Sequence, residues 1–205
     1  AELQPYKLKE WLELAACGKK HLRPSKIYPD KFYVPENIRQ KIDAWLDDKI
    51  FIYNNEYGNQ WQQAYNDMVD MVESGAKLLI IDNLFSMDIT SLEGDKNNQQ
   101  KEFILNVTTF ARKYECHCIV VCHPRKSTDF LRKESISGTA DLTNACDNCF
   151  IIHRVNNDFR KRGAEFFGES AITSYINYGN VLEVAKNRMF GVVDYLCGMY
   201  YEIES

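Results

Sequence analysis

Apolar residues recur along this chain with two different spacings, and each spacing predicts a kind of element. Apolar residues three and four positions apart predict helices at Pro5–Cys17, residues 38–46, Trp61–Glu73 and residues 103–111. Short apolar and β-branched runs predict strands at residues 50–53, Leu78–Ile81 and residues 119–122, 150–152, 181–185 and 195–201. Because strands alternate with helices, the pattern indicates an α/β fold with a largely parallel sheet.

Two stretches carry more specific expectations. Leu78–Ile81 is apolar without interruption, which predicts a strand buried on both faces. Residues 156–163 are polar and basic and predict an exposed loop, and no role is assigned to residues 156–178. With 205 residues, of which 45% are hydrophobic, the chain is expected to form a single domain over residues 1–205.

Charge and cysteine content restrict the function classes. The net charge of −4 gives no strong field toward nucleic acid or an anionic membrane, so any contact with nucleic acid has to be local. Seven cysteines without a paired framework, no secretory leader and no apolar run of membrane-spanning length predict an intracellular, non-secreted protein without membrane contact. We expect a cytoplasmic protein, bacterial or phage-encoded, or one that is otherwise intracellular. The chain begins with alanine, which suggests a fragment.

The residues that end the apolar runs carry the candidate chemistry, because ligands of α/β sheets bind beyond the carboxyl ends of the strands. KLLIIDN ends a strand in Asp82, in the manner of the aspartate that holds the magnesium shell in phosphate-transferring ATPases. An aspartate that caps a turn is an equally good interpretation. Asn83 stands where many ATPases have a glutamate, so a catalytic base has to come from elsewhere.

HCIVVCHPRK ends the next strand in His123, which is placed to hydrogen-bond a γ-phosphate, although a lone histidine is more often structural. Four cations follow in a loop rich in serine, threonine and aspartate: Arg125, Lys126, Arg132 and Lys133. The loop suits a phosphate backbone, and a solvated surface loop is the alternative.

KNR places Lys186 and Arg188 at another strand end, where an arginine can serve a neighbour's γ-phosphate; two surface cations are the alternative. The cysteines also invite a zinc hypothesis, because Cys146 and Cys149 form CxxC and residues 116–123 are rich in cysteine and histidine. Alternate side chains of a strand face opposite ways, so buried, apolar cysteines are favoured over a metal site.

A phosphate-binding GxxxxGK[ST] does not occur, and CGKKH at residues 17–21 is the nearest fragment. The order LLIIDN, VVCHPRK, SISGTADLTNACDNCFIIHR and VLEVAKNR nevertheless resembles the RecA-like domain of hexameric replicative DNA helicases. Within that family the Twinkle and phage primase-helicase type is most similar, followed by the DnaB type. The resemblance implies a RecA-like P-loop NTPase core, a mostly parallel twisted sheet flanked by helices, with the first strand and P-loop missing here.

The resemblance also implies roles for single residues, with ATP and Mg²⁺ as cofactors. Asp82 resembles the Walker B aspartate of the magnesium site, with Asn83 beside it at the nucleotide, and His123 resembles the γ-phosphate sensor. Lys186 and Arg188 resemble the pair that reaches the adjacent subunit, with Arg188 as the arginine finger. The catalytic glutamate of the family matches Glu2, in AELQPYKLKEWL.

The loop after His123 resembles the central-channel DNA loops of the family, which implies contacts with single-stranded DNA. The candidate residues are Arg125, Lys126, Arg132, Lys133, Ser137 and Gly138. A ring homo-oligomer, a hexamer by resemblance, stacks such loops around one strand, and a primase and a polymerase are further candidate partners.

Three functions remain open on the sequence. The first is an ATP-dependent replicative helicase that translocates on single-stranded DNA and unwinds duplex, of which this stretch alone is expected to be inactive. The second is a catalytically degenerate DNA-binding or loader module, and the third is a RecA-like ATPase that does not unwind. KNR and HPRK favour the helicase.

Overall fold

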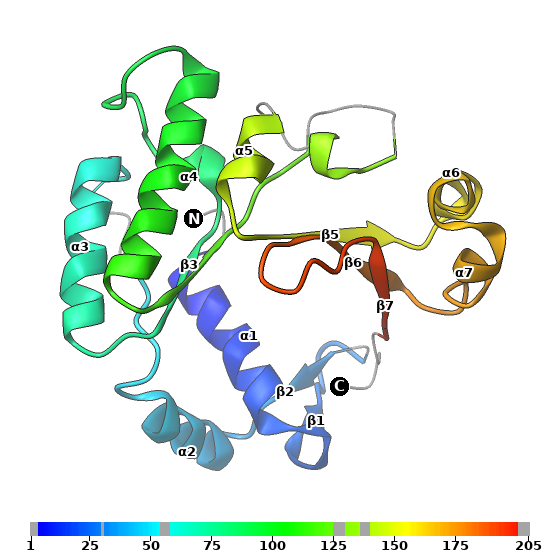
Figure 1. Cartoon of the computed structure of the whole chain (residues 1–205). Coiled ribbons are helices and arrows are strands. Elements are labelled where there is room, and N and C mark those ends of the chain that lie inside the picture. Colours follow the sequence, from blue (N-terminus) through cyan, green and yellow to red (C-terminus); the bar gives the residue numbers. More distant parts are fainter. Residues whose placement is uncertain (1–3, 30, 54–57, 125–129, 136–139, 201–205) are drawn as a thin grey trace. The chain divides into compact units, whose positions relative to one another are not determined.

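The computed structural model describes residues 4–29, 31–53, 58–124, 130–135 and 140–200. The sequence predicts a single domain, and the described residues group into two compact units, one up to Gly58 and one from Asn59 onward (Figure 1). Each unit has a buried core of its own. None of the helices in the described part of the chain is long and apolar enough to cross a bilayer.

The first unit holds two helices and a short antiparallel strand pair. Its elements are α1 (Pro5–Cys17), the 3-10 turn η1 (Lys19–His21), β1 (Arg23–Pro24), β2 (Phe32–Tyr33) and α2 (Glu36–Leu46). The sequence predicts α1 with these bounds: Pro5 suits a first turn, and Gly18 ends the helix with a φ of 68°. Four buried residues form the core: Cys17, Leu22, Val34 and Ile42.

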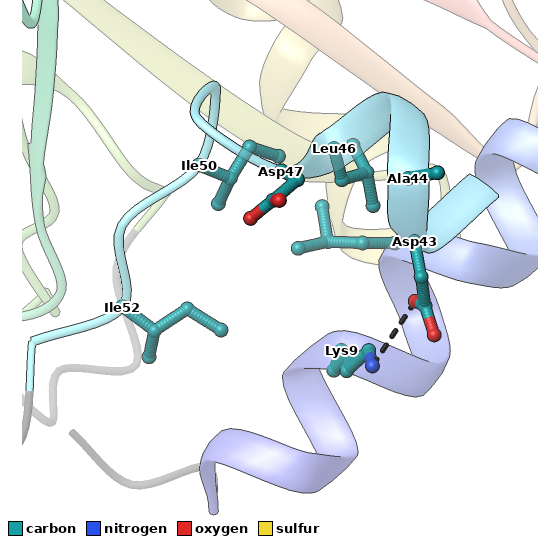
Figure 2. A pocket seen from close by; sticks show the side chains of 8 residues that line it. Lys9, Asp43, Ala44, Leu46, Asp47, Ile50 and Ile52 are labelled. Carbon is teal, nitrogen blue, oxygen red and sulfur yellow. Dashed lines mark ion pairs between the residues drawn. The ribbon is translucent and has the colours of Figure 1, made fainter. Parts of the chain in front are cut away.

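A groove of about 410 Å³ opens beside α1 and α2 in this unit, and Figure 2 shows the side chains that line it. Lys9 Nζ lies 3.0 Å from Asp43 Oδ1 there, while Ile50 and Ile52 line the groove from the chain after α2. The strand predicted at residues 50–53 is wrong, because this stretch has no strand conformation and both isoleucines are exposed. A β-rich run needs a partner strand, and none pairs with it among the described residues.

The second unit begins with a layer of helices on a parallel strand pair. β3 (Leu78–Ile81) pairs with β4 (His117–Val120), and α3 (Trp61–Glu73) and α4 (Lys96–Lys113) pack on this pair (Figure 1). The parallel pairing confirms the predicted direction for β3 and β4. Asp95 caps α4, since its Oδ1 accepts from Asn98 N at 2.9 Å.

The prediction that Leu78–Ile81 is buried on both faces is wrong for the described residues. Leu79 and Ile81 are buried under the helices, whereas Leu78 is 51% exposed and Ile80 is 62% exposed. Alternate residues of a strand face opposite sides, so the helices cover one face only. The other face is as apolar as a covered one.

The remaining strands form an antiparallel sheet in the order β5 (Asn148–Arg154), β6 (Asn180–Asn187) and β7 (Tyr195–Met199). This corrects the expectation of a largely parallel sheet. Parallel neighbours need a crossover of a dozen or more residues, and the connection between β6 and β7 is too short for one.

The exposed loop predicted at residues 156–163 is also wrong, because α6 (Asn157–Phe167) occupies it, followed by α7 (Glu169–Thr173). Asn156 starts α6, since its Oδ1 accepts from Phe159 N at 2.8 Å. Phe159 is only 2% exposed and packs with Phe130 and Ile172. Sparse apolar residues at helical spacing therefore bury one face of a largely polar helix.

Candidate functional site

The carboxyl ends of β3 and β4 lie side by side. Leu78 pairs with His117 and Ile81 with Val120 in parallel register, and Val121 N donates to Ile81 O at 2.9 Å. Asp82 and His123 therefore follow the ends of two neighbouring strands. This is the edge of an α/β sheet at which ligands bind.

Asp82 and Asn83 differ sharply in burial although they are neighbours in sequence. Asn83 is 2% exposed, whereas Asp82 is exposed and its carboxylate has no hydrogen-bond or ion-pair partner within the described residues. A carboxylate in this position is available to a cation or a bound ligand.

Asn83 organises the turn that follows β3. Its Oδ1 accepts from Phe85 N at 2.9 Å and from Ser86 N at 3.1 Å, and its own N donates to Ser86 Oγ at 3.2 Å. These bonds form a capping box on the 3-10 turn η3 (Leu84–Ser86). The two backbone donors identify the side-chain oxygen, so Nδ2 has to face the other way.

His123 is held by that amide and by an aromatic ring. Asn83 Nδ2 lies 3.0 Å from His123 Nε2, and the Phe85 ring stacks on the imidazole with 6.4 Å between centroids. An amide nitrogen only donates, so Nε2 of His123 is the acceptor in this contact. His123 therefore lies at the same edge as the Asp82 carboxylate.

The donor set at this edge fits magnesium brought by a phosphate ligand. Mg²⁺ is usually bound through one or two carboxylates together with substrate phosphates and water. No group of three or more histidine, cysteine, aspartate or glutamate side chains could hold a metal ion in the described stretches. Asp82 is an exposed carboxylate of the kind that such a site uses.

Lys186 and Arg188 make their contacts elsewhere, at the end of α5. Lys186 Nζ donates to three backbone carbonyls at the end of α5 (Ala140–Ala145), and Arg188 Nη1 donates to Asp147 Oδ1 at 2.7 Å. Both cations hold their own chain, where the sequence predicts a reach into an adjacent subunit.

Arg132 is anchored in the interior, where the sequence predicts a DNA contact. Its Nη1 lies 3.1 Å from Glu183 Oε1 and its Nη2 lies 3.1 Å from Asp194 Oδ1. Glu183 is fully buried, and its other oxygen lies 2.6 Å from His153 Nε2. Lys133, in the 3-10 turn η4 (Lys133–Ser135), is exposed, so these two neighbouring cations have different surroundings.

Five of the sequence-predicted site residues lie outside the described residues: Glu2, Arg125, Lys126, Ser137 and Gly138. Their proposed roles stay predictions. Of the predicted DNA contacts, Arg132 and Lys133 are the two that the structure describes.

Five cysteines line a cavity of about 620 Å³ beside β4 and β5: Cys116, Cys118, Cys122, Cys146 and Cys149. Burial raises the pKa of Cys118 to about 12, of Cys122 to about 11 and of Cys149 to about 12. These three thiols are therefore protonated at neutral pH, which makes them poor nucleophiles and poor metal ligands.

Sequence reasoning missed three carboxylates that engage the predicted cations: Asp147, Glu183 and Asp194. Asp147 lies 41 positions before Arg188, and Glu183 lies 51 positions after Arg132. No local spacing rule connects residues so far apart. A buried strand that carries one glutamate, as VLEVAKNR does, is the one signal for Glu183, because a buried charge needs a partner.

Part of the chain matches a known family. Residues 36–129 match a family model described as AAA domain, just under half of the chain. The match covers Asp82, Asn83 and His123 and ends before Lys186 and Arg188. It indicates a nucleotide-binding ATPase of the P-loop type. No curated protein matches the chain.

Proposed function

We propose that this protein is an ATP-driven DNA helicase that forms a ring, moves along single-stranded DNA and binds ATP between subunits. The observation that carries the proposal is the edge of β3 and β4, where an exposed Asp82 lies at one strand end and His123, held by Asn83, lies at the next. The AAA domain match includes this edge.

In this proposal Asp82 orients the ligand shell of a magnesium ion that arrives with ATP. The ion would neutralise charge on the β and γ phosphates when bound. His123 hydrogen-bonds a γ-phosphate oxygen while Asn83 holds Nε2, so loss of the phosphate changes the surroundings of the ring. The Phe85 ring keeps the imidazole in place during that change.

The strand that carries the phosphate-binding loop belongs, in this proposal, in the cavity beside β4 and β5. β4 is an edge of its two-stranded sheet and β5 is an edge of its three-stranded sheet, and both line this cavity of about 620 Å³. A strand edge presents unpaired backbone groups to a new partner. An inserted apolar strand would pair with both edges and join the two sheets.

The DNA contacts in the proposal come from the region after His123, of which Lys133 is the exposed and described cation. Several copies in a ring would place this region around one strand, where backbone contacts add up despite a net charge of −4 per chain. Arg188 would act on the nucleotide of an adjacent copy.

The test is ATP hydrolysis by the protein from its complete reading frame, with and without single-stranded DNA. We expect DNA-stimulated turnover that Asp82→Asn abolishes and that Arg188→Ala lowers by roughly 10³-fold or more. Lys31→Gln, a change of an exposed cation in the other unit, serves as the matched control and is expected to keep wild-type turnover.

A catalytically degenerate DNA-binding or loader module is the second candidate. The observation that favours it is Asn83, an amide where many ATPases have a base, with both ends of its side chain already engaged. Nucleotide and DNA binding without turnover would support this module and contradict the helicase. DNA-stimulated turnover without duplex unwinding would support an ATPase that does not unwind.

A further inference from the structure

Lys186 completes the C-terminal end of α5. Its Nζ donates to Thr143 O at 2.6 Å, Cys146 O at 2.7 Å and Asn144 O at 3.1 Å. The last carbonyls of a helix have no partner within the helix, and a cation is favourable there. With three oxygen partners, this ammonium group is fixed in place as a structural part of the helix end.

Arg188 makes fewer and more exposed side-chain contacts with the same end. Its Nη1 donates to Asp147 Oδ1 at 2.7 Å and its Nη2 donates to Asn144 O at 3.0 Å. The side chains of Arg188 and Asp147 are 48% and 41% exposed. An ion pair this exposed contributes little stability, so a phosphate with higher charge can displace Asp147 from Arg188.

Asp147 stays in position when Arg188 leaves. The same carboxylate oxygen accepts from Arg112 Nη2 on α4 at 2.9 Å, and Arg188 N donates to Asp147 O at 3.0 Å. The backbone contact and the second guanidinium group do not depend on the Arg188 side chain. Only the guanidinium of Arg188 has to move.

We propose that Asp147 is a positioning residue that holds Arg188 against α5 until a phosphate of a nucleotide on a second copy of this chain displaces it. The inference rests on the proposed function, since it takes Arg188 as the residue that acts on the adjacent copy. Asp147 and the phosphate compete for one guanidinium group. Asp147 therefore restrains turnover as long as the subunits are not in their productive arrangement.

The displacement of Asp147 from Arg188 also affects the helix that follows the region predicted to contact DNA. When Arg188 leaves, Asn144 O loses one of its two cationic partners at the end of α5, and Lys186 keeps the other. α5 begins at Ala140, two positions after Gly138, the last predicted DNA contact. The state of Arg188 is thereby linked to the helix that follows this region in the chain.

The experiment measures ATP hydrolysis by the protein from its complete reading frame, without DNA and with single-stranded DNA. We expect Asp147→Asn to raise DNA-free kcat about three- to fivefold, because Arg188 is no longer held by a charge. The ratio of DNA-stimulated to DNA-free turnover falls by the same factor. Asp147→Glu restores the carboxylate and returns both values toward those of the wild type.

Arg112→Gln is the matched control, because it removes the other guanidinium from the same oxygen and leaves Arg188 paired. Its DNA-free turnover is expected to stay at the wild-type level. If Asp147 were merely structural, both variants would lower thermal stability and neither would raise turnover, which would overturn the inference.

The failures of the two proposals are distinguishable. If the wild-type protein binds ATP but does not hydrolyse it, the proposed function is contradicted. The inference then fails as well, because it needs a nucleotide phosphate that binds Arg188 during turnover. If DNA stimulates wild-type turnover but Asp147→Asn has a DNA-free rate at or below that of the wild type, only the inference is overturned.

A double-mutant cycle of Asp147→Asn with Arg188→Gln, measured by urea unfolding, tests the contact without turnover. We expect about threefold coupling in the unfolding constant, and no coupling would contradict the inference.

Discussion

At the scale of single residues, Asn83 connects the fold of the turn after β3 to the candidate sensor. One buried amide caps η3 through its oxygen and contacts His123 through its nitrogen. A glutamate at this position would bring a charge into a place that is 2% exposed. The local structure therefore explains why this position carries an amide and no base.

We expect Asn83→Ala to lower the free energy of unfolding by about 1–3 kcal/mol, because it removes a cap and leaves buried donors without partners. His123→Ala changes an exposed side chain and should lower the free energy of unfolding by less than about 1 kcal/mol. Urea unfolding of both variants measures the difference. Equal losses would mean that the capping box contributes nothing.

The buried thiols give a second prediction at this scale. Because burial raises the pKa of Cys122 to about 11 and of Cys149 to about 12, both should resist iodoacetamide at pH 7.5, while the exposed Cys197 is labelled first. Mass spectrometry of peptides over time measures the order, and urea should make all of them equally reactive.

The same shifts predict a loss of stability in alkali. A thiol whose folded pKa lies above its ordinary value of 9.0 favours folding below that value, and this contribution is lost as pH rises through the folded pKa. Unfolding should therefore become easier from about pH 9 to 11. Replacement of Cys122 and Cys149 by alanine should flatten this dependence, and an unchanged dependence would contradict the assignment.

At the scale of elements, the two neighbouring cations Arg132 and Lys133 separate folding from DNA binding. Arg132→Gln leaves the buried Glu183 with one partner fewer and is expected to cost about 2–4 kcal/mol of stability. Lys133→Gln should change stability by less than about 0.5 kcal/mol. Thermal and urea unfolding measure both.

Binding to single-stranded DNA provides the opposite comparison. Lys133→Gln should weaken binding and reduce the slope of log K against log salt by about 0.7, the value for one lost phosphate contact. If Arg132→Gln kept full stability and reduced the slope of log K against log salt by the same amount, Arg132 would be a DNA contact. Its ion pair with Glu183 would then contribute nothing to stability.

The elements themselves were predictable where the pattern was local. Pro5–Cys17, Trp61–Glu73 and Leu78–Ile81 have the predicted bounds, because apolar spacing and a glycine or polar stop mark them. α6 was missed because few apolar residues anchor a polar helix. The antiparallel direction of β6 and β7 was missed because side-chain alternation is the same in either direction.

At the scale of the whole molecule, β6 connects the described part of the region predicted to contact DNA with α5, the helix that follows this region. Glu183 on this strand binds Arg132, and Lys186 at its end binds the carbonyls that close α5. The candidate site was predictable at Asp82 and His123, since neighbouring parallel strands end at one edge. The links to β6 were not, because they join residues that are distant in sequence and depend on how the sheet folds back.

The last prediction concerns the assembly. If Arg188 acts on the nucleotide of an adjacent copy, Asp82→Asn and Arg188→Ala variants are each inactive alone, yet a mixed ring contains interfaces in which both residues are intact. Random assembly from equal amounts gives such an interface in about one quarter of cases, since each interface joins two different surfaces. ATP hydrolysis after the two variants are mixed and reassembled should therefore approach about one quarter of wild-type turnover. Each variant mixed with itself is the control. No recovery, in mixtures shown to exchange subunits, would place Arg188 in the site of its own chain and remove the ring from the mechanism.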